Sequence, residues 1–66
     1  MNILLNNKPE ILFDGSTIQK LLENKNIKNK YFAVEINSKI IPKSDHDTYV
    51  INDGDRIEII TAIGGG

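Results

Sequence analysis

In this 66-residue sequence, a single segment has the apolar spacing of a helix. Within DGSTIQKLLENKN, Ile18, Leu21 and Leu22 recur at helical intervals and form one apolar stripe. Ser16 followed three residues later by Gln19 is typical of a capping box, so Ser16 is the predicted N-cap. A helix of about ten residues is marginal in isolation. The rest of the chain therefore has to provide a surface on which this helix packs.

The remaining apolar runs alternate with a period of two and predict strands. These runs lie at residues 3–5, 11–13, 31–37, 39–42 and 56–63. The first two are joined by polar turn residues and predict a hairpin, while Asn37-Ser38 and NDGD predict further turns. The order is strand, strand, helix, strand, short strand, strand, which predicts an α+β fold with one helix on one face of a mixed sheet. If the last strand lies beside the first, the two are parallel and central.

Alternation divides the apolar side chains between the two faces of this sheet. The predicted core contains Ile3, Leu5, Ile11, Phe13, Ile18, Leu21, Leu22, Phe32, Val34, Ile36, Ile57 and Ile59. The opposite face is predicted to carry Leu4, Ala33, Ile41 and Ile60 among the charged residues Glu35, Arg56 and Glu58. Scattered apolar residues are common on protein surfaces. A contiguous patch with a charged rim favours a partner-binding surface, and that is the interpretation we prefer.

Composition excludes several classes of function. The chain has no cysteine, so disulfides, thiolate metal sites and thiol nucleophiles are ruled out. Its net charge is −1 with both signs mixed along the chain, which indicates neither nucleic-acid nor membrane binding. No signal peptide or membrane span is recognisable, so a cytoplasmic protein is expected.

The SDHD stretch contains the sole histidine and is the one candidate for a metal site or a catalytic triad. Neighbouring residues on an irregular segment rarely converge on one atom, and no second histidine completes a ligand set. We therefore predict a solvated loop at Asp45–Asp47, with no metal site and no catalytic residue in the chain.

Three stretches of the sequence together resemble the ThiS family of sulfur carrier proteins of thiamin thiazole biosynthesis. They are MNILLNNK at the start, FAVEINSKIIPK in the middle and NDGDRIEIITAIGGG at the end. The resemblance covers essentially the whole chain and implies the β-grasp fold shared with ubiquitin-like proteins. Asn37-Ser38 departs from the Asn-Gly turn expected in many members, which should change only the local turn strain.

The resemblance also implies a chemistry for the C-terminus. Gly66 would be the terminus that is adenylated and converted to a thiocarboxylate, with Gly65 and Gly64 preceding it in the tail. The implied partners are a ubiquitin-activating-type adenylating enzyme (ThiF type), a thiazole synthase (ThiG type) and a sulfur donor protein. The chain would bind no cofactor itself, because ATP is consumed by the activating partner, and it would not be an enzyme.

We expect a domain over residues 1–63, with the β-grasp fold that the resemblance implies, followed by a flexible glycine tail at residues 64–66. Three extended residues reach roughly 10 Å, and glycine can pass through a narrow channel because it has no side chain. Fold and tail alone leave three alternatives open. These are the small subunit of molybdopterin synthase, a ubiquitin-like modifier joined through Gly66 to a lysine, and a passive interaction domain.

Overall fold

The structure, a computed structural model, describes residues 1–27 and 32–61. Its elements are β1 (Asn2–Leu5), β2 (Lys8–Ile11), α1 (Ile18–Asn24), β3 (Phe32–Ile36), β4 (Lys39–Ile41), the 3-10 turn η1 (Lys43–Asp45) and β5 (Arg56–Thr61). The element order predicted from periodicity is confirmed. The predicted boundary between the domain and its tail, at residues 63 and 64, lies outside the described residues.

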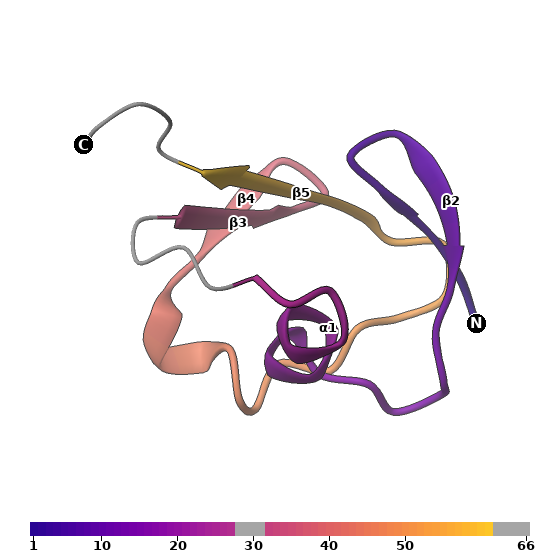
Figure 1. The fold of residues 1–66 in the computed structure, drawn as a ribbon, viewed down its shortest axis with the longest axis horizontal. Coiled ribbons are helices and arrows are strands. Elements are labelled where there is room, and N and C mark those ends of the chain that lie inside the picture. Colours follow the sequence, from indigo (N-terminus) through magenta and orange to yellow (C-terminus); the bar gives the residue numbers. More distant parts are fainter. Residues whose placement is uncertain (28–31, 62–66) are drawn as a thin grey trace.

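The five strands form one mixed sheet in the order β2-β1-β5-β3-β4. The first and last strands are parallel neighbours, with Leu4 opposite Arg56 and Leu5 opposite Ile57. All other strand pairs are antiparallel. Figure 1 shows α1 lying across one face of this sheet, which is the α+β arrangement predicted from the sequence. The parallel pairing makes β5 a central strand, held on both sides before its end.

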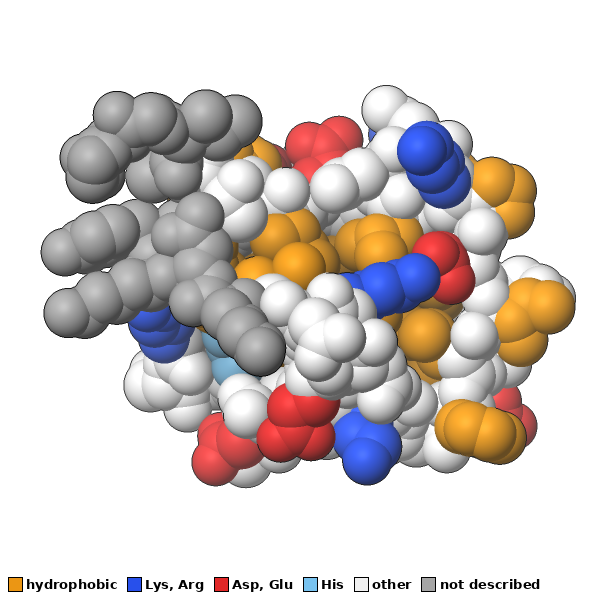
Figure 2. Space-filling view, in the orientation of Figure 1, with side chains coloured by type: hydrophobic (Ala, Val, Ile, Leu, Met, Phe, Trp, Pro, Cys, Tyr) orange, Lys and Arg blue, Asp and Glu red, His pale blue; other side chains and the backbone are white. Residues whose placement is uncertain are grey.

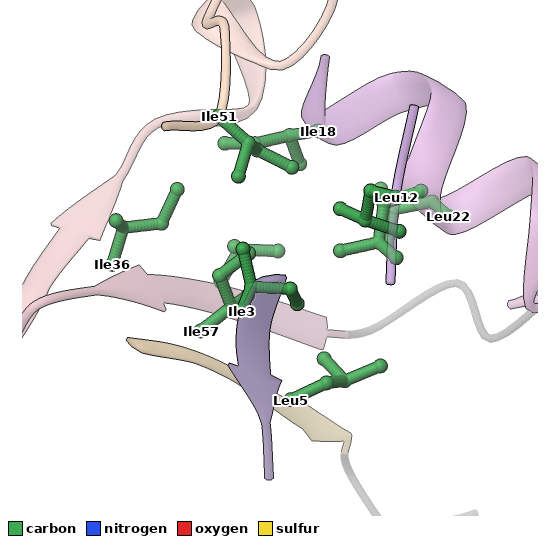
Figure 3. Packing of buried hydrophobic residues seen from close by; sticks show 10 residues of the cluster. Ile3, Leu5, Leu12, Ile18, Leu22, Ile36, Ile51 and Ile57 are labelled. Carbon is green, nitrogen blue, oxygen red and sulfur yellow. The ribbon is translucent and has the colours of Figure 1, made fainter. Parts of the chain in front are cut away.

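The core lies between α1 and the sheet (Figure 3). Its buried side chains are Ile3, Leu5, Leu12, Ile18, Leu21, Leu22, Val34, Ile36, Ile51 and Ile57. All three residues of the predicted helical stripe are buried, as are the predicted inward residues Ile3 and Leu5 of β1 and Val34 and Ile36 of β3. Phe32 and Ile59 pack against this cluster from its margin. Ile51 extends the core beneath the segment that precedes β5, a position that periodicity had not assigned.

The predicted core positions of Ile11 and Phe13 are wrong. Both side chains are exposed, at 80% and 87%, and Leu12 between them is buried instead. Ile3 pairs with Glu10 and Asn2 pairs with Ile11, which places Ile11 on the outer face. A shift of one residue in register moves every side chain of a strand to the other face. The sequence pattern did not reveal that β2 begins at Lys8, with Lys8 and Glu10 on its inner side.

Pro9 can belong to β2 because of the direction of its missing N–H. Leu12 and Met1 exchange hydrogen bonds in both directions. Because bonded and non-bonded residues alternate in an antiparallel pair, residue 10 also bonds to β1, while the backbone groups of residues 9 and 11 point away from it. The absent donor therefore lies on the free edge of the sheet. Proline at such a position discourages another strand from pairing there.

Two further expectations about local structure are corrected. The N-cap of α1 is Thr17, whose side chain accepts a hydrogen bond from the Lys20 amide, whereas the Ser16 hydroxyl donates to the Phe13 carbonyl. His46 is buried, so the prediction that it is solvated is wrong. Its backbone carbonyl accepts a hydrogen bond from the Gln19 amide, and its ring forms a hydrogen bond with the Ile41 carbonyl at 3.0 Å. The segment after η1 is thus tied to both α1 and β4.

Candidate functional site

The predicted functional residues Gly64, Gly65 and Gly66 lie outside the described residues. What the structure does describe is the body from which they continue. β5 ends at Thr61, so the two faces of the sheet around Ile59, Ile60 and Thr61 are the surfaces adjacent to the start of the tail. A partner that takes up Gly66 has to approach one or both of them.

β5 is aligned by a polar network at its start. The buried Asp55 carboxylate accepts hydrogen bonds from the Asn52 amide at 2.8 Å and from the Asn37 side chain at 3.1 Å. Asn37 also accepts from the Arg56 amide and donates its own amide to the Arg56 carbonyl. These hydrogen bonds therefore join the NDGD turn to the turn between β3 and β4. Because charge-assisted bonds of this kind are stronger than neutral ones, they fix where β5 begins and so the line along which it runs.

On the outer face of the sheet, Ile60 lies directly opposite Ala33. Ile60 is 51% exposed, and both residues belong to the predicted partner-binding surface. Leu4 is also on this face, but it lies opposite Arg56. Arg56 and Ile60 are four positions apart along β5, which is about 13 Å. Leu4 and Ile60 therefore do not form one contiguous patch, since Arg56 and Glu58 lie between them on the outer face.

Ile41 was assigned to the wrong face. It pairs with the buried Val34 and packs against the core from the helix side. Its neighbour Ile40, opposite Glu35, is the exposed apolar residue of β4 at 69%. Lys39–Ile41 holds two adjacent isoleucines, so alternation alone does not decide which of them faces inward. We call Ala33, Ile40 and Ile60 the outer-face group.

The helix side of the sheet contains a hollow of about 430 Å³ at the end of β5. Its apolar lining comes from Leu5, Ile27 and Ile59, and its polar rim consists of Asn6, Lys8, Glu10, Lys25 and Thr61. Lys25 and Glu10 form an ion pair, at 2.5 Å, that joins the end of α1 to β2. In Figure 2 hydrophobic side chains are visible in the middle of the view, beside a basic and an acidic side chain in contact. The seven-residue α1 is too short to cover the sheet here.

No signal in the sequence indicated this hollow. It arises because β1 ends at Leu5 while β5 continues to Thr61, so the end of β5 extends beyond its parallel neighbour. The Asn6 side-chain oxygen accepts a hydrogen bond from the Ile59 amide at 2.9 Å, which replaces a strand-to-strand hydrogen bond at that point. Such an offset depends on strand register, which hydropathy patterns do not specify.

Two negative findings concern only the described part of the chain. Residues 1–27 and 32–61 contain no group of three metal-ligating side chains. Over the same residues, no helix has the length and apolar character to cross a membrane.

The fold and its relatives define a class of protein. A crystal structure of a thiamine biosynthesis protein (ThiS) from Geobacter metallireducens superimposes with a TM-score of 0.85 at 28% identity and covers both chains completely. The five-stranded mixed sheet with one helix is thus a β-grasp fold, as the resemblance implied.

Sequence comparison then gives the family. The ThiS family model matches residues 3–66, and this chain belongs to that family. The sulfur carrier protein ThiS of Escherichia coli is 32% identical over the full length of both chains. A thiazole synthase of Paramagnetospirillum magneticum is 35% identical over all of this chain, which spans 20% of that longer protein.

Proposed function

We propose that this chain is a sulfur carrier for the thiazole ring of thiamin, and that the C-terminal carboxyl group of Gly66 carries the sulfur as a thiocarboxylate. The observation that carries the proposal is the family match, which runs through residue 66 and so includes the glycine ending. A full-length relative named as a sulfur carrier supports the same role. The chain acts as a substrate of other enzymes and is not itself an enzyme.

The chemistry requires activation because a carboxylate is a poor electrophile. Attack of the Gly66 carboxylate on the α-phosphorus of ATP forms an acyl adenylate and releases pyrophosphate. A hydrosulfide equivalent delivered by the donor protein then attacks the acyl carbon and displaces AMP, and loss of its proton leaves a thiocarboxylate on Gly66. The adenylating enzyme supplies phosphate contacts and orientation, and the carrier supplies the acyl end. Since this step consumes ATP, we place it in the cytoplasm.

The tail suits a carrier that visits more than one enzyme. Ordering each tail residue costs roughly 1–2 kcal/mol of backbone entropy, which keeps the complexes weak. Contact with apolar surface at the end of β5 would offset part of that cost, at about 25 cal/mol per Å² buried. We propose that the outer-face group makes such contacts with the adenylating enzyme. Both enzymes are needed, since one forms the thiocarboxylate and the other, a thiazole synthase, accepts the sulfur.

The decisive experiment is intact mass spectrometry of the chain after incubation with ATP, an adenylating enzyme of this family and a sulfur donor. We expect a mass gain matching replacement of one oxygen by sulfur, located at Gly66 by fragmentation. Omitting ATP is the matched control and should abolish the gain. A stable adduct on a lysine of another protein would instead identify a ubiquitin-like modifier. Transfer of the sulfur to a pterin precursor would identify a molybdopterin synthase subunit.

A further inference from the structure

The end of β5 has a strand edge that no described strand covers. The Asp55 and Ile57 carbonyls accept from the Leu4 and Asn6 amides, so the odd residues of β5 direct their backbone groups toward β1. On the other side, Asn37 bonds to Arg56, so the even residues bond to β3. Because β1 ends at Leu5, the amide and carbonyl of Thr61 point to an edge without a neighbouring strand among the described residues.

This edge borders the apolar hollow directly. Ile59 and Thr61 line the hollow from β5, and Leu5 and Ile27 complete its near side. Lys8, an exposed rim residue, has no ion-pair partner within the part of the chain described, whereas Lys25 and Glu10 neutralise each other. A strand added to an open edge gains affinity from main-chain hydrogen bonds and specificity from pockets that take alternate side chains. The edge and the hollow together provide both features.

We propose that thiazole synthase adds an extended segment to the free edge of β5, with one apolar side chain in the hollow and a neighbouring carboxylate on Lys8. The position relative to the tail supports this occupant. Residues 62–66 span at most about 17 Å when extended, so an enzyme that buries Gly66 has to contact the surroundings of Thr61. The comparisons favour thiazole synthase, because in one such enzyme a domain like this one is part of the same chain.

The inference rests on the proposed function, and it divides the two enzymes between the two faces of the sheet. The adenylating enzyme would use the outer-face group, and thiazole synthase would use the edge and the hollow on the helix side. Both surfaces flank the same tail, so the two enzymes would compete for the carrier and could not hold it together.

The test measures affinity of the full chain for a purified thiazole synthase of this family by titration calorimetry. Lys8→Glu should weaken binding about fivefold at low salt and less at high salt, because a rim charge is screened. Ile27→Ala should weaken it about tenfold, since it removes part of the apolar lining. The matched controls are Lys39→Glu and Ile41→Ala on β4 at the other edge of the sheet, and both should bind within about twofold of the unchanged chain.

A second readout examines strand addition itself. Exchange of the Thr61 amide hydrogen should slow at least about tenfold in the complex, since a new hydrogen bond would protect it. All four variants should still form the thiocarboxylate at the unchanged rate. Unaltered affinity of both Lys8→Glu and Ile27→Ala, or an unprotected Thr61 amide, would overturn the inference and leave the carrier function intact. Failure of the unchanged chain to form a thiocarboxylate would overturn the proposed function itself.

Discussion

Single residues in this fold hold backbone conformations that their side chains do not favour. Asn37 and Ser38 between β3 and β4 both have positive φ, at 51° and 73°. Two positive φ values are characteristic of a tight hairpin turn of type I′, for which Asn-Gly is the preferred pair. Asn37 is also fixed by its hydrogen bonds to Asp55 and Arg56. The Ser38 side chain, in the position that glycine usually fills, makes no such hydrogen bond within the described part of the chain.

Replacing Ser38 with glycine should therefore stabilise the protein. Left-handed backbone costs a non-glycine residue about 1–2 kcal/mol. The greater freedom of glycine in the unfolded chain offsets part of the stabilisation, so we expect the free energy of unfolding to rise by about 0.5–1 kcal/mol. Urea unfolding followed by circular dichroism measures it. Ser44→Gly is the control, because η1 has no positive φ at that residue, and it should give no gain. Equal effects of the two substitutions would contradict the assignment of strain to Ser38.

At the scale of elements, the sequence predicts well where local pattern and fold agree. The helical stripe of α1 and the inward positions of β1 and β3 follow from spacing, and the parallel pairing of β1 with β5 follows from element order once the two strands are neighbours. Errors occur where a register has to be chosen. In β2 and β4 the apolar residues are adjacent to others or displaced by one position, and only pairing with the neighbouring strand decides which face each residue occupies.

The same limit explains what could be foreseen of the site. The glycine ending and the exposed position of Ile60 were readable from the sequence. The hollow and the free edge of β5 were not, because both come from the different lengths of β1 and β5 and from the shortness of α1. These are properties of packed elements, and no single stretch of sequence contains them.

The corrected register of β4 makes a prediction about two adjacent isoleucines. Ile41→Ala should lower the free energy of unfolding by about 1–2 kcal/mol, less than for a fully buried isoleucine, because the side chain packs at the margin of the core. Ile40→Ala should change it by no more than about 0.5 kcal/mol, because that side chain is largely exposed. Chemical denaturation of the two variants in parallel provides the measurement. The reverse order of effects would restore the original assignment of Ile41 to the outer face.

At the scale of the whole molecule, the outer-face group is predicted to act in binding and not in folding. Ile60→Asp should weaken association with the adenylating enzyme about tenfold while lowering the free energy of unfolding by at most about 1 kcal/mol, the span of strand propensities. Val50→Asp is a matched control, since Val50 is similarly exposed at 48% but is not in the sheet. Surface plasmon resonance with the immobilised enzyme would show the difference. Unchanged affinity of Ile60→Asp would remove the outer-face group from the proposed interface.

The tail and the folded body should be separable, because every buried hydrophobic side chain of the described residues lies between Ile3 and Ile57. Deleting Gly65 and Gly66 should therefore leave the melting temperature nearly unchanged while abolishing thiocarboxylate formation. The shortened chain still ends in a carboxylate. However, that carboxylate is two residues, about 7 Å, short of the position where the adenylating enzyme holds ATP. Thermal denaturation and intact mass measured on the same sample separate the two effects. A truncated chain that is still converted would show that reach is not what the glycine tail provides, and the carrier proposal would then fail.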